Sequence, residues 1–458
     1  MSTINPSGKE ITSVTVDYCG RPLTLEVNRV GFRTTASVLV RYGDTVVLGS
    51  VQVGSRPIQL DYFPLSVDYE EKMYAAGKIS GRFIKREGRP SDEAILIGRI
   101  IDRPIRPLFP KGYRAEVQVV ASVLSMDPSF RPDMVAMIAA SSALMLTGAP
   151  FDGPVAGLRV GRVNGEFKAF LSPEEREESD LDLVVAGKDS GIVMVEAAAN
   201  EVPEEVVAEA LAWAHKALQP AIELQKQLAE KVAPKAQEYE LVLPNEEIQS
   251  EVDKWMHDKL GTALRKPYPE RNEMVNDLRW KFHEAMRETV VEYDGLYDEY
   301  DEAFTMALHK DVRRGIVEDG LRPDGRKLDE IRQLSSEVGF LPRAHGSSLF
   351  TRGVTQGLNI VTLAPLSYAQ MVDTMEVTDG ERRYMHHYNA PGYTVGEVKR
   401  LGGAGRREIG HGYLAERAVM PVLPSEEDFP YAIRSVTEIM SQNGSTSMAA
   451  TCSSVLAL

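Results

Sequence analysis

The sequence contains an internal duplication, and this feature limits the possible folds more than any other. Residues before position 150 recur after position 321 in three blocks that keep their order. Two like domains can pack as pseudo-equivalent subunits, and such pairs tend to assemble into closed rings. The matches include Gly43 with Gly353, Thr45 with Thr355, Gly98 with Gly412, Arg103 with Arg417, Pro107 with Pro421, Ser141-Ser142 with Ser453-Ser454 and Leu146 with Leu458.

Local patterns predict a mixture of strands and helices in each copy. Apolar alternation predicts strands within residues 10–55 and at 117–126, 155–170 and 182–196. Helical spacing and helix-start residues predict helices at 92–102, at 132–146 and, as one amphipathic helix, at 203–231. Residues 239–318 have little glycine and place apolar residues at i, i+4, which predicts a helical insertion between the copies.

Composition restricts the class of protein. The chain has 458 residues, a length typical of about two to four domains. It has no apolar run long enough to span a membrane and no secretory signal, and its two cysteines are too few for a disulfide framework. We therefore expect a cytoplasmic protein. The net charge of −15 argues against a surface that binds nucleic acid everywhere, but it leaves room for a local basic channel.

The later copy contains a hydroxyl-rich helix start, Ser441 to Ser447, in which Ser445, Thr446 and Ser447 follow Gly444. Backbone N–H groups and the helix dipole favour an anion at such a position, and the hydroxyls add donors. An ordinary helix cap is the alternative. The matching residues of the first copy cannot hold phosphate; they are Asp133, Met134 and Val135.

Two further groups of residues in the later copy are candidates for binding anions. Arg406 and Arg407 can pair with phosphate through two hydrogen bonds each, and His411 can bind phosphate or substrate or act as an acid. The alternative is a solvated arginine pair and a packed histidine. Arg352 ends a predicted strand and is either an RNA contact or a surface arginine. The first copy has Asp92, Glu93, Ile97 and Tyr42 at the matching positions.

A loop of the first copy combines an aromatic residue with cations, which suits RNA binding, although a solvated loop is the alternative. Its candidate residues are Phe83, Lys85, Arg86 and Arg89. His386 and His387 are neighbours on a predicted strand and therefore face opposite sides, so we interpret them as structural residues and not as metal ligands.

Several stretches together resemble the ribonuclease PH family, and within it the bacterial members that have two copies of the domain and a helical insert. They are YGDTVVL, KREGRPSDEAILIGRIIDRPIRPLFP, LDLVVAG, LRPDGRKLDEIR, LFTRGVTQ, RREIGHG and SQNGSTSMA. The resemblance implies an α+β fold of two ribonuclease PH-like βαβα domains, the second incomplete, joined by an all-helical domain. The expected domains are a non-catalytic core at 1–232, a helical domain at 233–318 and a catalytic core at 319–458.

The resemblance also implies a function. The protein would be a homotrimer that degrades single-stranded RNA processively from the 3′ end in mRNA turnover, with RNA-degradosome proteins among its partners. Inorganic phosphate would release nucleoside diphosphates in a reversible reaction. Ser445, Thr446 and Ser447 would hold phosphate, and Arg406, Arg407 and His411 would contact phosphate or the RNA end. Phe83, Lys85 and Arg86 would line the channel mouth, where Ile84 and Lys85 depart from the family pattern of two aromatics and two arginines.

The resemblance implies Mg²⁺ or Mn²⁺ as a cofactor, held by residues beyond Leu458. The first copy keeps one possible ligand, Asp182, but has Arg176 and Val184 where another acid and a lysine would stand. We therefore expect the second domain to be incomplete and this chain alone to be inactive. The alternatives are a non-catalytic ring subunit that binds RNA and a metal-dependent hydrolytic exoribonuclease. Nothing in the sequence decides whether the protein also makes guanosine pentaphosphate.

Overall fold

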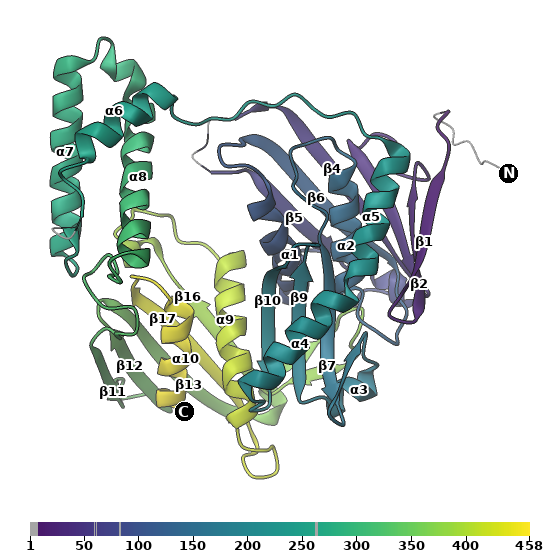
Figure 1. Ribbon diagram of the computed structural model, residues 1–458. Helices are drawn as coiled ribbons and strands as arrows, with labels where there is room; N and C mark the ends of the chain where they lie inside the picture. Colours follow the sequence, from purple (N-terminus) through teal and green to yellow (C-terminus); the bar gives the residue numbers. More distant parts are fainter. Residues whose placement is uncertain (1–7, 59, 61, 82–83, 262–263) are drawn as a thin grey trace. The chain divides into compact units, whose positions relative to one another are not determined.

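The protein is described by a computed structural model that covers residues 8–58, 60, 62–81, 84–261 and 264–458. Its chain divides into a larger unit, residues 1–241, 336–350 and 355–458, and a smaller unit, residues 242–335 and 351–354. Strands and helices alternate in the larger unit, whereas three helices, α6 to α8, make up most of the smaller one (Figure 1). No helix in the described part of the chain is both long and apolar enough to cross a membrane.

The first copy is built on a six-stranded sheet in the order β1-β2-β3-β4-β6-β5, in which only β5 runs parallel to its neighbour. Its strands alternate buried and exposed residues, as expected for a sheet with one face on the core. The strands are β1 Thr12–Tyr18, β2 Arg21–Val27, β3 Ala36–Tyr42, β4 Thr45–Pro57, β5 Leu65–Glu70 and β6 Ala115–Ser125. The helices are α1 Asp92–Ile105 and α2 Asp133–Met145, with 3₁₀ turns η1 Met73–Ala76 and η2 Arg106–Leu108.

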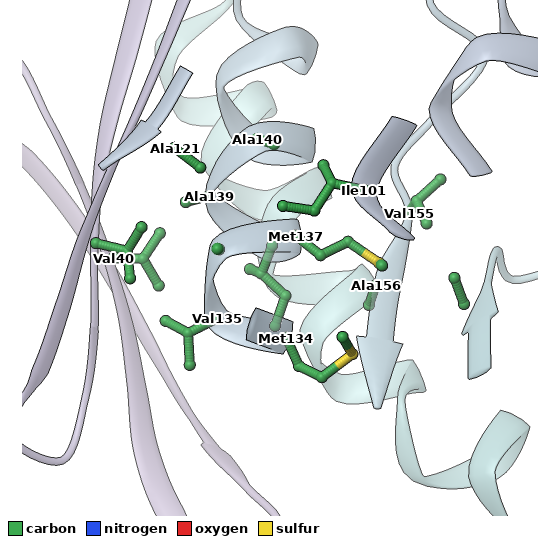
Figure 2. Close-up of a cluster of buried hydrophobic side chains, with 14 of the residues drawn as sticks. Val40, Ile101, Ala121, Met134, Val135, Met137, Ala139, Ala140, Val155 and Ala156 are labelled. Carbon is green, nitrogen blue, oxygen red and sulfur yellow. The ribbon is translucent and has the colours of Figure 1, made fainter. Parts of the chain in front are cut away.

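Helix α2 lies between this sheet and a second one. The second sheet has the order β10-β9-β7-β8, with β7 Ala156–Val163, β8 Glu166–Ala169, β9 Leu181–Gly187 and β10 Ile192–Ala199. Figure 2 shows Val135 of α2 facing Val40, and Met134 and Met137 on the side of Ala156. A helix that is apolar all round is stable only when it is covered on all sides, and α2 is buried from Asp133 to Leu144.

The predicted helix at 203–231 is in fact two helices, and in this detail the sequence prediction was wrong. Helix α4 spans Glu204–Ala217 and helix α5 spans Gln219–Val232, with the short α3, Pro173–Glu178, before them. Pro220 causes the break, because proline has no N–H to donate to the preceding turn and its ring clashes with the carbonyl four residues earlier. It is tolerated where it stands, in the first turn of α5.

The second copy repeats five of the six strands of the first copy's main sheet, in the same order, and its two helices, which confirms the fold class and the duplication. Its main sheet has the order β11-β12-β13-β17-β16, in which β17 runs antiparallel to β13 and parallel to β16, as β6 does to β4 and β5 in the first copy. The elements are β11 Leu334–Val338, β12 Gly346–Arg352, β13 Thr355–Pro365, β16 Tyr384–Asn389, β17 Tyr431–Ser441, α9 Arg406–Val419 and α10 Thr446–Ala457. The 3₁₀ turns are η4 Leu366–Tyr368, η5 Gly392–Val395 and η6 Met420–Val422, and β14 Gln370–Val372 pairs with β15 Gly380–Arg382.

The duplication extends to single hydrogen bonds. The Thr45 hydroxyl accepts the N–H of Asp127 at 3.0 Å, and the Thr355 hydroxyl accepts the N–H of Asn443 at 3.1 Å. Each threonine begins the long central strand of its sheet and is fully buried. The loop that enters the second helix of each copy is therefore fixed in the same way in both.

The smaller unit contains helices α6 Glu246–Met256, α7 Glu270–Thr289 and α8 Tyr293–Val317. Phe282 and Phe304 form the centre of its apolar core. A buried ion pair joins Arg265 to Asp311 at 2.8 Å. The domain boundaries expected from the sequence, 232/233 and 318/319, remain predictions.

Candidate functional site

The hydroxyl-rich segment forms the entrance to α10, and we call Ser445, Thr446 and Ser447 the cradle. Ser445 is exposed, has a left-handed backbone (φ 45°), and makes no side-chain cap to the helix. The hydroxyl is thus not used as an ordinary cap, which was the alternative interpretation. The N–H groups of the first helical turn have no carbonyl partner within the helix, so they can serve an anion.

Strand β13 fixes the loop before the cradle through Thr355. The Thr355 hydroxyl donates to the Gly444 carbonyl at 3.2 Å while it accepts from Asn443. Gly444 has φ +82°, a conformation that side chains other than glycine rarely adopt. The tight turn therefore depends on this glycine and on the buried threonine beneath it.

Gln442 joins three segments at this place. Its N–H donates to the Thr394 carbonyl at 2.9 Å, and its side-chain amide donates to the Thr394 hydroxyl at 2.5 Å. Its side-chain oxygen accepts from the Arg407 guanidinium at 3.5 Å. Arg407 is thereby brought to the cradle loop, as the sequence hypothesis requires. The sequence reasoning missed Gln442 because a glutamine inside a hydroxyl-rich motif carries no signal of its own.

His411 reaches the cradle through Tyr388. The two rings meet edge to face with centroids 5.0 Å apart, and the Tyr388 hydroxyl donates to that of Thr446 at 2.6 Å. Thr446 is buried, so its hydroxyl faces this contact, unlike exposed Ser445 and half-buried Ser447. Burial, and then the charges of Arg407 and Arg99, lower the pKa of His411 to about 4. Its imidazole is therefore neutral at neutral pH.

Arg406 binds the first copy. Its guanidinium donates to the Val67 carbonyl at 2.6 Å and to the Asp68 carboxylate, both on β5. Helices α1 and α9 lie close together here. A Cβ added to Gly410 of α9 would lie only 2.4 Å from the Arg99 side chain of α1, so glycine allows this approach. The structure thus separates the two neighbouring arginines: Arg407 is turned to the cradle loop and Arg406 to the other half.

The remaining predicted residues come from other segments of the chain. Lys85, Arg86 and Arg89 are exposed in the loop between η1 and α1. Phe83 lies outside the described residues. Arg352 is the half-buried last residue of β12, and its charge, after burial, contributes to lowering the pKa of Arg332.

A buried polar network supports α10 from the sheet. The Asn359 side-chain amide donates to the hydroxyls of Ser435, Thr437 and Ser454 at 2.8–3.1 Å. The His386 ring contacts the hydroxyl of Ser454 at 2.8 Å. The strand alternation predicted for the two histidines is confirmed, with His386 buried and His387 exposed. The same register positions in the first copy are apolar; they hold Gly49, Val67, Val119 and Ala121.

The network predicts a pH-dependent stability. Burial lowers the pKa of His386 from 6.5 to about 4. As the pH falls, His386 takes up a proton in the unfolded chain before it does so in the folded chain. The contribution of His386 to the free energy of unfolding is therefore fully present above pH 6.5 and is lost as the pH falls towards 4. The expected loss is about 3 kcal/mol. It is measured as the difference in unfolding free energy between pH 7 and pH 4 for the unsubstituted chain and for His386→Val.

Other groups titrate in both proteins, so the difference between them isolates His386. Absolute stabilities will differ, because valine leaves hydroxyls unpaired, and only the pH dependence is compared. Equal pH dependence in the two proteins would show that His386 does not titrate in this range.

The described residues do not fit a catalytic metal. Among them, no three His, Cys, Asp or Glu side chains gather closely enough to hold an ion. Asp182, the possible ligand kept by the first copy, accepts from Arg159 at 2.6 Å and from Arg417 at 2.8 Å. Burial would raise the pKa of Asp182, but these two charges outweigh it and lower the pKa. A carboxylate so engaged is not available to a cation, and no step is assigned to a metal.

The comparisons with known proteins agree with the duplication. Residues 20–150 and 330–458 both match domain 1 of the 3′ exoribonuclease family, RNase PH, and residues 153–217 match its domain 2. A polyribonucleotide nucleotidyltransferase of Anoxybacillus flavithermus is 48% identical over 97% of this chain and 63% of its own length. The corresponding proteins of Heliobacterium modesticaldum and Halalkalibacterium halodurans are 48% and 46% identical, each over 97% of this chain and 62% of its own length. The chain thus spans somewhat less than two thirds of these curated relatives.

Proposed function

The chain belongs to the RNase PH family of 3′ exoribonucleases, and from this premise we propose that the protein has polyribonucleotide nucleotidyltransferase activity and shortens single-stranded RNA from its 3′ end with inorganic phosphate. The observation that carries the proposal is the cradle. Its exposed Ser445, the N–H groups of a helix start, which have no carbonyl partner within the helix, and Arg407 beside the loop together suit a free phosphate ion.

In the proposed reaction an oxygen of bound phosphate attacks the phosphorus of the last 3′–5′ linkage. The bond from phosphorus to the O3′ of the preceding nucleotide breaks, and that oxygen takes the proton that the attacking hydrogen phosphate ion gives up. The products are a nucleoside 5′-diphosphate and an RNA one nucleotide shorter. The reverse reaction lengthens RNA from diphosphates.

We assign the residues as follows. Ser445 and Ser447 hold phosphate through their hydroxyls, and Thr446 does so through its backbone N–H, since its hydroxyl faces Tyr388. Arg407 balances the charge of the phosphate. His411, neutral at neutral pH, donates or accepts a hydrogen bond and is a poor source of protons. Arg406 anchors α9 to β5 and positions Arg407.

The remaining assignments rest on the family resemblance. We propose a cytoplasmic homotrimer that uses Mg²⁺ or Mn²⁺, with Phe83, Lys85, Arg86, Arg89 and Arg352 as RNA contacts and degradosome proteins as partners. The cores at 1–232 and 319–458 would be the non-catalytic and catalytic halves, with the helical domain at 233–318 between them.

The test is the phosphate dependence of RNA degradation by the protein at its natural length. We expect labelled phosphate to appear in nucleoside diphosphates, and RNA loss to stop when phosphate is omitted. Release of monophosphates at the same rate without phosphate would identify a hydrolase. RNA binding without any release would identify a ring subunit that serves as a scaffold.

A further inference from the structure

The turn η5 and the loop after it, residues 391–405, adjoin the cradle and hold side chains without an assigned role. Tyr393 is 59% exposed, and its hydroxyl donates to the Met440 sulfur at 3.7 Å. The next residue, Thr394, accepts both hydrogen bonds from Gln442 of the cradle loop. An exposed aromatic ring is therefore fixed at the edge of the cradle.

The same loop, together with the first two residues of α9, is basic in an acidic protein. Residues 391–407 contain Lys399, Arg400, Arg406 and Arg407 but one acid, Glu397, whereas the whole chain has a net charge of −15. Lys399 and Arg400 are exposed, and neither forms an ion pair with any residue that the structure describes. Unpaired neighbouring cations beside a phosphate site attract a polyanion.

The first copy shows which part of this arrangement is special. Turn η1 corresponds to η5 and also exposes a tyrosine, Tyr74, at 57%. The loop after it likewise contains two adjacent cations, Lys85 and Arg86. The loop entering α2 has no hydroxyl cradle, however, because Asp133 begins that helix. Only in the second copy does the exposed tyrosine ring lie beside a hydroxyl cradle that can bind phosphate.

We propose that Tyr393, Lys399 and Arg400 form a subsite for the 3′-terminal nucleotides of single-stranded RNA. The Tyr393 ring stacks on a base, and the two cations pair with backbone phosphates. Stacking tolerates every base, which suits an enzyme that must pass each nucleotide in turn. The inference rests on the proposed function and adds to it the residues that hold the polymer next to the phosphate.

The test uses the 458-residue chain and a 5′-labelled oligoribonucleotide of about eight nucleotides, the order of one single-strand site. Fluorescence anisotropy gives the Kd for Tyr393→Leu, Tyr393→Phe, the double variant Lys399→Ala/Arg400→Ala, and Tyr368→Leu. Tyr368 is a matched control, because its side chain is 71% exposed and it lies far from the cradle. It follows Pro365, which pairs with Tyr431 at the start of β17, whereas the cradle loop follows Ser441 at the end of that strand. Tyr431 and Ser441 are ten residues apart on β17, which corresponds to about 33 Å along an extended strand.

We expect Tyr393→Leu to weaken RNA binding roughly 5- to 150-fold, the range for loss of one base stack. Tyr393→Phe and Tyr368→Leu should stay within about twofold, since the first keeps the ring and the second lies at the other end of the strand pair. The double variant should reduce the slope of log Kd against log salt by about 1.4. Calorimetry with inorganic phosphate should give the same affinity for Tyr393→Leu as for the unsubstituted chain.

The outcomes separate this inference from the proposed function. If Tyr393→Leu binds RNA as the unsubstituted chain does, the subsite is refuted while phosphorolysis stands. If the unsubstituted chain does not bind the oligonucleotide, the subsite is refuted, and release of diphosphates by the protein at its natural length decides the proposed function separately. A surface that instead serves a protein partner would leave RNA affinity and its salt slope unchanged in all four variants.

Discussion

Ser445→Asp is expected to reduce phosphate-dependent RNA degradation by about 10³-fold or more while the protein stays folded. The new carboxylate would accept the N–H groups at the start of α10 and repel the phosphate that they would otherwise bind. Aspartate is a favourable helix cap and tolerates the left-handed backbone of Ser445, so the melting temperature should be unchanged or higher.

Two measurements and one control make this result specific. Release of diphosphates is measured on the protein at its natural length, and phosphate binding is measured by calorimetry. Ser445→Ala is the control, because it removes one donor without adding charge and should cost about 10- to 100-fold. If Ser445→Asp keeps activity within about tenfold of the unsubstituted protein, phosphate is not held at this helix start.

Arg159→Ala is expected to destabilise the larger unit by about 3–5 kcal/mol. Its guanidinium binds Asp133 at 2.7 Å and Asp182 at 2.6 Å, and the Asp133 side chain is only 1% exposed. Removing the arginine leaves a buried carboxylate without its countercharge. Chemical denaturation of the chain at neutral pH measures the loss.

Arg41→Ala is the matched control for a surface pair. Arg41 binds Glu26 at 3.1 Å, its side chain is 45% exposed, and Arg29 also binds that carboxylate. Its loss should cost less than about 1 kcal/mol. The double variant Arg159→Leu/Asp133→Leu should recover part of the stability, because both charges leave the interior together. Equal losses for Arg159→Ala and Arg41→Ala would mean that the Asp133 carboxylate is solvated in the native protein.

The sequence predicted those features that depend on local pattern. The two strand-helix copies, the hydroxyl-rich start of α10 and the alternation of His386 and His387 all follow from periodicity, caps and repeats. Pro220 was also a local signal, but it lay inside an amphipathic pattern strong enough to suggest one continuous helix.

The contacts that give the candidate site its geometry could not be predicted in this way. Neighbouring Arg406 and Arg407 are equivalent in the sequence, yet one binds β5 and the other Gln442. The burial of the Thr446 hydroxyl by Tyr388 and the lowered pKa of His411 depend on strands and helices far apart in the chain. Such properties arise from tertiary packing, for which a single sequence has no periodic signal.

Ion pairs join the two copies and make the stability of each copy depend on the other. Arg406 reaches Asp68, Arg417 reaches Asp182, and Arg131 reaches Glu376, so each half supplies countercharges that the other lacks. Covalent linkage keeps these halves at a fixed one-to-one ratio, as a separate subunit could not. A substitution that disturbs one half should therefore also remove countercharges from the other half and lower the stability of both.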